Sequence, residues 1–196
     1  AREAALRHRG LVLQGRKMKR CRQAEALAKR ALRHGDTGAD SVLKVLRHWH
    51  FAPNIRRQNV TMKGLSFVYS DSFGLLRGPN SWGLTSLSRK FPSISALLME
   101  FGKGLGSRFP SARNFFLHGW TTITLNRGRL GHGACRHRDT RNTGPTMVVA
   151  LGNAAGGELL TWPKDNMAAP ITSLLRRDAK VNVCQGRPVI FDGRQA

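Results

Sequence analysis

The chain has 196 residues, of which 40% are hydrophobic, and its formal net charge is +22. This length can bury a core without disulfides, the composition excludes wholesale disorder, and no apolar run reaches the about 20 residues that a transmembrane helix needs. Three scattered cysteines without a Cys-x-x-Cys pair predict no disulfide framework and favour a reducing, intracellular compartment, whether cytoplasm, nucleus or organelle.

The first 60 residues carry the greatest excess of positive charge. They hold fifteen Lys and Arg against four Asp and Glu, whereas residues 101–196 hold fourteen against five. Clustered cations attract polyanions by releasing counterions, which predicts that residues 1–60 bind nucleic acid, a ribosome-like particle or an anionic membrane surface. Two alternatives stay open. One is an arginine-rich surface without such a partner, and the other is a transit or linker segment.

Two helices are predicted in this basic segment. Over Met18–His34, apolar residues recur at helical spacing among Lys and Arg, and Gly35 follows as a C-terminal stop. A second helix is expected to start at Asp40 or Ser41 as its N-cap and to end before Pro53. The segment should therefore be helical.

After residue 60, the sequence first predicts a strand, a turn and a helix, and then a series of short strands. Residues 65–70 favour a strand, residues 78–81 a turn and residues 92–101 a helix, which the glycines at 102–106 should terminate. Short β-rich runs separated by Gly, Asn, Asp and Pro then follow at 120–125, 134–139, 146–151, 158–162, 180–184 and 188–191. Helices first and strands second predict an α+β fold, in which the strands form a sandwich or barrel.

The strand predicted at 134–139 contains His137-Arg138-Asp139. Side chains two apart on a strand share a face, so His137 and Asp139 would point at one ion while Arg138 points away. A non-haem iron site uses two His and one carboxylate, so the pair matches two of the three ligands. With seven His and seven Asp in 196 residues, about 0.25 such spacings arise by chance. The spacing alone therefore also fits a surface His beside an exposed acid.

Several short motifs, taken in order, resemble a known enzyme family. They are Thr121–Asn126, His137-x-Asp139, Asn142–Thr146, Ala150–Gly152, Gly156–Leu159 and Phe191–Arg194. Over residues 120–196 they resemble the 2-oxoglutarate and Fe(II)-dependent oxygenases of prolyl-4-hydroxylase type, in a branch common in protist sequences. Residues 88–101 are similar to the helix that precedes the barrel in that family, whereas residues 1–60 have no counterpart.

The resemblance implies a fold and a site. The fold is a double-stranded β-helix, a jelly roll with a core barrel at residues 115–196, within a domain of residues 61–196 that follows the basic helical segment. In the site, His137 and Asp139 would bind Fe(II), and Asn126 would contact the cosubstrate 2-oxoglutarate. The resemblance assigns no catalytic residue beyond the metal ligands.

The resemblance also implies that the iron site continues past the last residue. In the family the third ligand is a distal His that follows a Phe-Asp-Gly-Arg pattern, and a basic residue that anchors 2-oxoglutarate lies further on. Phe191–Ala196 fills that pattern up to the position of the His. The chain is therefore expected to be a C-terminally truncated fragment that does not turn over by itself.

Three arginines crowd the predicted ligand segment, namely Arg136, Arg138 and Arg141. Their charge is expected either to weaken the binding of a cation or to guide an anionic substrate.

The leading hypothesis is thus an Fe(II)- and 2-oxoglutarate-dependent dioxygenase that hydroxylates an unidentified substrate, either a protein side chain or a nucleic-acid base. The alternative is a non-catalytic basic protein that binds nucleic acid or a ribosome on a jelly-roll scaffold, because a fold does not fix a function.

Overall fold

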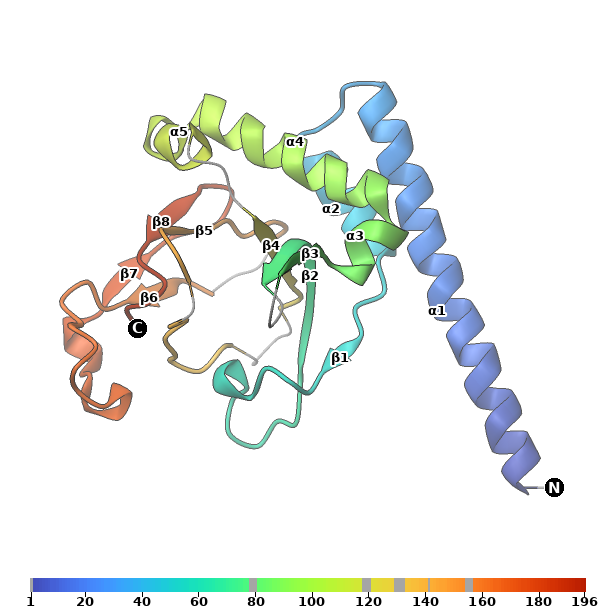
Figure 1. Ribbon diagram of the computed structural model, residues 1–196, viewed down its shortest axis with the longest axis horizontal. Helices are drawn as coiled ribbons and strands as arrows, with labels where there is room; N and C mark the ends of the chain where they lie inside the picture. The colour runs from blue at the N-terminus through green and yellow to red at the C-terminus, as the bar shows by residue number, and fades with distance from the viewer. Residues whose placement is uncertain (1, 78–80, 118–120, 129–132, 141, 154–156) are drawn as a thin grey trace. The chain divides into compact units, whose positions relative to one another are not determined.

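The computed structural model describes residues 2–77, 81–117, 121–128, 133–140, 142–153 and 157–196 (Figure 1). Two compact units share these residues. Unit 1 comprises residues 1–52, 71–101 and 121–125, and unit 2 comprises residues 53–70, 102–120 and 126–196. Helices and strands occur in both units, which confirms the predicted α+β class.

The secondary-structure elements follow one another from the N-terminal helix to a strand near the C-terminus. They are α1 (Arg2–Arg33), α2 (Ala39–His48), β1 (Pro53–Asn54), η1 (Gln58–Val60), β2 (Val68–Arg77), β3 (Trp82–Leu84), α3 (Ser86–Lys90), α4 (Pro92–Arg108), α5 (Pro110–Leu117), β4 (Thr122–Asn126), β5 (Thr146–Val148), β6 (Leu159–Thr161), η2 (Ile171–Ser173), η3 (Arg176–Asp178), β7 (Lys180–Asn182) and β8 (Val189–Phe191).

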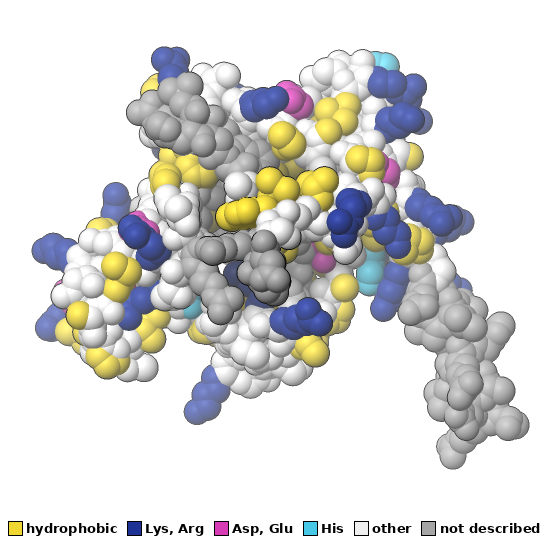
Figure 2. Space-filling model, in the orientation of Figure 1, with side chains coloured by type: hydrophobic (Ala, Val, Ile, Leu, Met, Phe, Trp, Pro, Cys, Tyr) yellow, Lys and Arg dark blue, Asp and Glu magenta, His cyan; other side chains and the backbone are white. Residues whose placement is uncertain are grey.

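Over residues 15–33, one face of α1 is buried in unit 1, and the other faces solvent. Cys21, Ala24 and Ala28 are buried and recur at positions i, i+3 and i+7, the spacing of one helix face. Lys and Arg side chains lie along the exposed side of the helix (Figure 2). The helix ends before Gly35, whose φ of 70° is left-handed and costs a glycine little. The predicted stop is therefore confirmed.

Trp49 lies at the centre of the core of unit 1. It follows α2 directly and is buried with its indole against the rings of Phe73, at 5.6 Å, and Phe91, at 4.9 Å. Its Nε1 donates a hydrogen bond of 2.8 Å to the carboxylate of Asp71 on β2. Burial raises the pKa of Asp71, and the bond from Trp49 opposes this rise. The core thus joins α2 to β2 through one aromatic side chain.

A carboxylate from α1 caps the start of α4. Glu25 accepts hydrogen bonds from the amides of Ser93, at 2.7 Å, and Ile94, at 3.0 Å. Pro92 opens the helix, so these are among the first amides that lack a partner inside it. Ile94 is fully buried, and α4 is therefore held at its first turn by both packing and charge.

The strands of unit 2 form nested pairs. β5 pairs antiparallel with β8, with Thr146 opposite Phe191. β6 and β7, which lie between them in sequence, pair antiparallel with each other, with Leu159 opposite Asn182. In unit 2 the start of β2 also pairs with β1, whereas in unit 1 its end pairs with β3. Val60, Leu105, Ala112, Trp162 and Cys184 are the buried apolar side chains of unit 2, together with Ala196.

Most of the predicted strands are present, but one is not. β4 to β8 overlap the runs predicted for them, and β2 begins within the strand predicted at 65–70 and runs on to Arg77. Residues 134–139, in contrast, form no strand, so that prediction is wrong. Of the turn predicted at 78–81, residues 78–80 lie outside the described part of the chain.

Two predicted helix boundaries are wrong. The second helix begins at Ala39 with Gly38 as its N-cap, and no side chain caps it. α4 does not end at the glycines of 102–106 but continues to Arg108. Gly102 and Leu105 are buried, so packing outweighs the low helix propensity of glycine there.

The compact units divide the chain at other points than the predicted boundary after residue 60. Residues 1–52 share a core with residues 71–101, and residues 53–70 belong to unit 2. Within the described ranges, no helix combines the length and the apolar character that crossing a bilayer requires.

Candidate metal half-site

His137 and Asp139 lie side by side although their segment is not a strand. His137 Nε2 is 3.9 Å from Asp139 Oδ1, and 27% and 34% of the two side chains remain exposed. Two donors bound side by side at about 2.1 Å from one divalent ion lie about 3 Å apart. The side chains would need to approach each other by about 1 Å to hold a common ion, which a small torsional change provides.

A backbone contact fixes the protonation pattern of the neutral His137 ring. Its Nδ1 lies 2.8 Å from the carbonyl oxygen of Cys135. A carbonyl oxygen only accepts hydrogen bonds, so Nδ1 carries the proton and Nε2 presents its lone pair on the side of Asp139. The same arrangement orients most histidines that bind metals.

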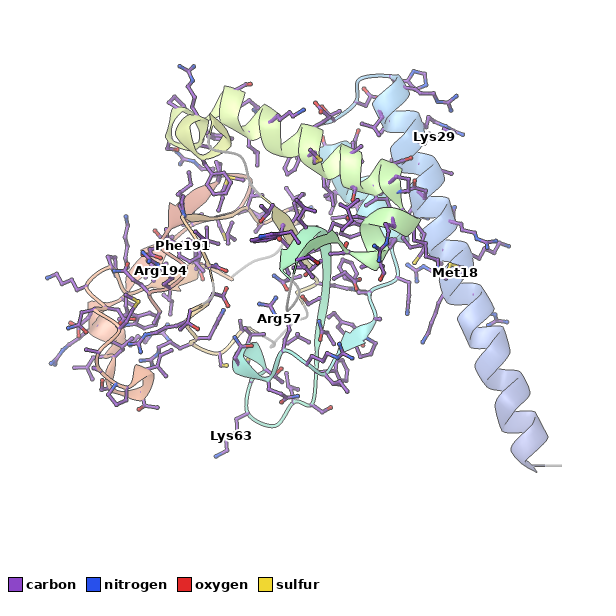
Figure 3. The ribbon with its side chains drawn as sticks, viewed as in Figure 1. Met18, Lys29, Arg57, Lys63, Phe191 and Arg194 are labelled. Atoms are coloured by element: carbon purple, nitrogen blue, oxygen red, sulfur yellow. The ribbon has the colours of Figure 1, made fainter. Side chains whose placement is uncertain are left out.

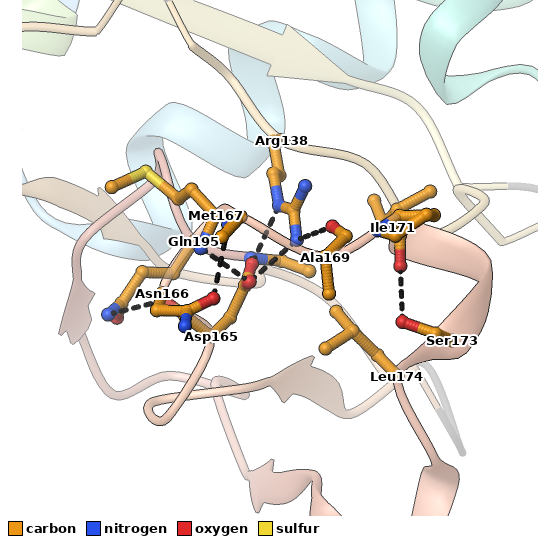
Figure 4. Close-up of polar contacts among 12 residues, drawn as sticks. Arg138, Asp165, Asn166, Met167, Ala169, Ile171, Ser173, Leu174 and Gln195 are labelled. Atoms are coloured by element: carbon orange, nitrogen blue, oxygen red, sulfur yellow. Dashed lines mark hydrogen bonds and ion pairs between the residues drawn. The ribbon is translucent and has the colours of Figure 1, made fainter.

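Arg138, which stands between His137 and Asp139 in the sequence, is bound by Asp165 (Figure 4). Its Nε and Nη2 donate to the two carboxylate oxygens at 2.7 and 2.6 Å, and Nη2 also donates to the carbonyl of Ala169 at 3.0 Å. This two-pronged pairing fixes the guanidinium in both position and orientation. The residue between His137 and Asp139 is thus anchored by Asp165 and Ala169.

Asp165 is the centre of this anchor. Its side chain is 1% exposed, and besides Arg138 it accepts hydrogen bonds of 2.9 Å from the amides of Met167 and Ala196. The bonds from Arg138, followed by those from the two amides, lower the pKa of Asp165 to about 2 against the opposing effect of burial. We call Asp165 with these partners the Asp165 anchor.

Arg136 is also engaged away from the pair. Its guanidinium lies over the ring of Trp162, with Cζ 4.7 Å from the ring centroid, and donates to the carbonyls of Ile171 and Leu174. The guanidinium groups of Arg136 and Arg138 therefore make structural contacts, and the charge of Arg138 is balanced by Asp165. The expectation that they act on a bound cation or an anionic substrate finds no support in these contacts. Arg141 lies outside the described residues.

Gly193 closes the other side of the segment. Its carbonyl accepts a 2.8 Å hydrogen bond from the amide of Asp139. A Cβ at this position would collide with Thr146 Oγ1 and lie 2.8 Å from Asn142 Nδ2, so only glycine fits without displacement. Phe191 is the last residue of β8, and Arg194 directly follows this glycine (Figure 3). The Phe-Asp-Gly-Arg motif thus runs beside Asp139.

The polar residues of that motif pair with each other. Arg194 Nη2 lies 2.7 Å from Asp192 Oδ2, and its Nε donates to Oδ1 at 3.0 Å. This pairing lowers the pKa of Asp192. Both side chains are substantially exposed.

The remaining predicted contact residue is Asn126. It is the last residue of β4 and is exposed, and its contact with 2-oxoglutarate stays a prediction. Within the described ranges, no third His, Cys, Asp or Glu joins His137 and Asp139 in a group that could hold a metal. The structure therefore offers two candidate ligands, a half-site.

The chain holds a second His-x-Asp sequence, which the sequence analysis did not use. His34 and Asp36 follow α1, are exposed, and are separated by the left-handed Gly35. A left-handed residue breaks the extended geometry in which side chains two apart share a face. His34 and Asp36 therefore have the sequence spacing of His137 and Asp139, but the residue between them has a left-handed backbone conformation.

Sequence reasoning missed Asp165 and Trp162. Asp165 follows Pro163 and Lys164 in a run that is typical of a turn, and its amide bonds back to the carbonyl of Trp162 at 2.9 Å. Its partner Arg138 is 27 residues away, so no local signal pointed to the pairing.

Comparisons with protein-family models, with curated proteins and with solved structures give no match to this chain.

Proposed function

We propose that unit 2 carries part of the iron site of an Fe(II)- and 2-oxoglutarate-dependent dioxygenase, with His137 and Asp139 as two of its ligands. The observation that carries the proposal is the fixed orientation of His137. Its Nδ1 lies 2.8 Å from the carbonyl oxygen of Cys135, and its Nε2 lies 3.9 Å from Oδ1 of Asp139. When bound, Fe(II) together with 2-oxoglutarate supplies the oxygen chemistry that hydroxylates a C–H bond.

The strand pairing of unit 2 supports the jelly-roll part of this proposal. β5 with β8 forms an outer pair and β6 with β7 an inner pair, and the two pairs belong to separate sheets. A jelly roll is built from two such sheets by Greek-key connections, in which a later strand returns beside an earlier one.

The residues around the half-site have supporting roles in this proposal. The Asp165 anchor holds Arg138 on one side, and Gly193 accepts the amide of Asp139 on the other. Both contacts restrict the backbone between the two ligands, so the donors are arranged before a metal arrives. Such preorganisation raises affinity without adding a contact. Asn126 remains the proposed contact of 2-oxoglutarate, and the substrate class is open between protein and nucleic acid.

Metal titration of the purified chain tests the proposal. Co(II) is a spectroscopic probe for Fe(II), and we expect His137→Ala and Asp139→Ala each to weaken its binding at least tenfold. His34→Ala and Asp36→Ala are matched controls, because they remove the same residue types at the same spacing, and they should leave binding unchanged. Equal effects in the two pairs, or no effect of the first pair, would contradict the assignment.

The rival function is a basic binding protein that uses the same scaffold without iron. The observation in its favour is that no third ligand joins the pair within the described residues. It predicts that Co(II) binds no better to the wild type than to His137→Ala. In the dioxygenase, iron-dependent decarboxylation of 2-oxoglutarate should be lost in both half-site variants.

A further inference from the structure

The exposed face of α1 carries a row of cations. With about 100° of rotation per residue, five exposed Lys and Arg side chains fall within an arc of about 100° on the side opposite the buried face. They are Lys19, Arg22, Lys29, Arg30 and Arg33. We call these five residues the basic stripe. Lys29 projects from α1 in Figure 3, and Lys and Arg side chains follow the described part of the helix in Figure 2.

Within residues 15–33, the helix offers no free counter-charge to the stripe. Between residues 15 and 34 the sequence holds one acid, Glu25. Both oxygens of Glu25 accept amides at the start of α4, at 2.7 and 3.0 Å, so this carboxylate is committed to the inner side of the helix. Arg20 is likewise committed, because it donates to the carbonyl of Arg47 at 3.0 Å. The stripe is therefore a surface of repelling like charges, which an external anion would relieve.

The side chains around the basic stripe favour a nucleic acid over a membrane as its partner. Helices that lie on membranes insert a face rich in Trp, Phe or Leu beside their cations. Within residues 15–33, the apolar face of α1 is instead used by the core, through Cys21, Ala24 and Ala28, and the side chain that interrupts the stripe is the small Ala26. Along this part of the helix a membrane would thus gain charge contacts but no apolar burial.

The stripe also has the dimensions of a phosphate backbone. Lys19 and Arg33 are fourteen residues apart, which corresponds to about 21 Å along a helix. A DNA duplex presents one negative charge per about 1.7 Å of its axis, so about twelve phosphate charges fall within that length. All five side chains are flexible cations suited to phosphate contacts, and such contacts carry no sequence information.

We propose that the basic stripe of α1 is a binding surface for double-helical nucleic acid, recognised through its phosphates without base specificity. The inference does not rest on the iron half-site, which belongs to the other unit. If the protein is a dioxygenase, the stripe would hold its substrate or the surroundings of its substrate. If the protein is not a dioxygenase, the basic stripe alone would define its binding partner.

Fluorescence anisotropy of a labelled 20-base-pair DNA duplex, titrated with the full chain from 50 to 300 mM NaCl, tests the proposal. The stripe variant replaces all five residues by Gln, and the control variant replaces five exposed cations of unit 2 by Gln. The control positions are Arg56, Lys63, Arg176, Arg177 and Lys180. Both variants carry the same net charge, so any difference between them reports position. Circular dichroism checks that both keep their helices.

We expect the stripe variant to bind at least 100-fold more weakly at 100 mM NaCl and its salt slope to be shallower by about 4, since each lost phosphate contact removes about 0.9 from that slope. The control variant should lose less than tenfold. Equal losses would overturn the proposal, because net charge would then explain the binding. Tighter binding to phosphatidylserine vesicles than to the duplex would also overturn it. If the stripe variant unfolds, the double variant Arg22→Gln/Arg33→Gln takes its place in the comparison of duplex affinities. Its salt slope should then be shallower than that of the wild type by about 2.

Discussion

Replacement of Asp165 by Asn would test the anchor behind the half-site. The wild-type carboxylate accepts two hydrogen bonds from Arg138 and one each from the amides of Met167 and Ala196. Asn is neutral and has one accepting oxygen in place of two. The variant therefore leaves some of these donors without an acceptor and removes the counter-charge of the guanidinium.

The expected loss follows from the pKa of Asp165, which the structure lowers from 3.8 to about 2. One pKa unit corresponds to about 1.4 kcal/mol, so the shift alone gives about 2.4 kcal/mol, which solvent screening of the partly exposed Arg138 reduces to about 1–2 kcal/mol. The hydrogen bonds from the two amides already contribute to this pKa shift, so they add no separate amount. We expect Asp165→Asn to lower the free energy of unfolding by about 1–2 kcal/mol at pH 7.

The pH dependence provides a second test of the same reasoning. The pKa of the folded state lies below that of the unfolded state, so the ionic contribution is full above about pH 5 and is lost as the pH falls through about 2. At pH 3 about half of it remains. The difference between wild type and Asp165→Asn should therefore shrink by about half of its ionic part between pH 7 and pH 3.

Urea unfolding followed by tryptophan fluorescence at pH 7 and pH 3 measures both effects. Asp192→Asn is the matched control, because Asp192 forms the same two-pronged pair with Arg194 in an exposed position, and its loss should be much smaller. A stability of Asp165→Asn equal to that of the wild type at pH 7 would refute the anchor. A loss that is the same at both pH values would refute its ionic origin.

Two further substitutions test the packing of each unit. Gly193→Ala should lower the free energy of unfolding by about 1–3 kcal/mol, because the new methyl group would collide with Thr146, whereas Gly128→Ala has open space and should be neutral. Equal urea midpoints for these two variants would contradict the close approach at Gly193. Glu25→Ala should lower the free energy of unfolding by about 1–2 kcal/mol and speed hydrogen exchange of the first amides of α4. Glu25→Gln should have effects between those of the wild type and Glu25→Ala. Unchanged exchange in Glu25→Ala would disprove the cap.

Helices α1, α2 and α4 and most strands could be predicted because their signals are local, whereas α3 and α5 were not predicted. The buried face of α1 and the stop at Gly35 follow from residue spacing and backbone freedom within a few turns. α4 shows where such signals fail. Its glycines at 102–106 favour a helix end, but the buried Leu105 among them holds the helix together through contacts that the local sequence does not display.

The candidate site shows the same limit more sharply. The spacing of His137 and Asp139 predicted a shared face, and their side chains do lie together, but the strand that was to cause this is absent. Their arrangement depends on contacts with Cys135, Asp165 and Gly193, two of which are distant in sequence. His34 and Asp36 have the same spacing, but they are exposed and flank the left-handed Gly35.

The two units are interleaved along the chain. The chain passes from one unit to the other five times, and β2, α4 and β4 each contribute residues to both. The units alternate along the chain, so no single cut would separate them. The second half of α1 belongs to unit 1, because its Cys21, Ala24 and Ala28 are buried there. The basic stripe therefore lies on a helix that also supplies buried side chains to unit 1.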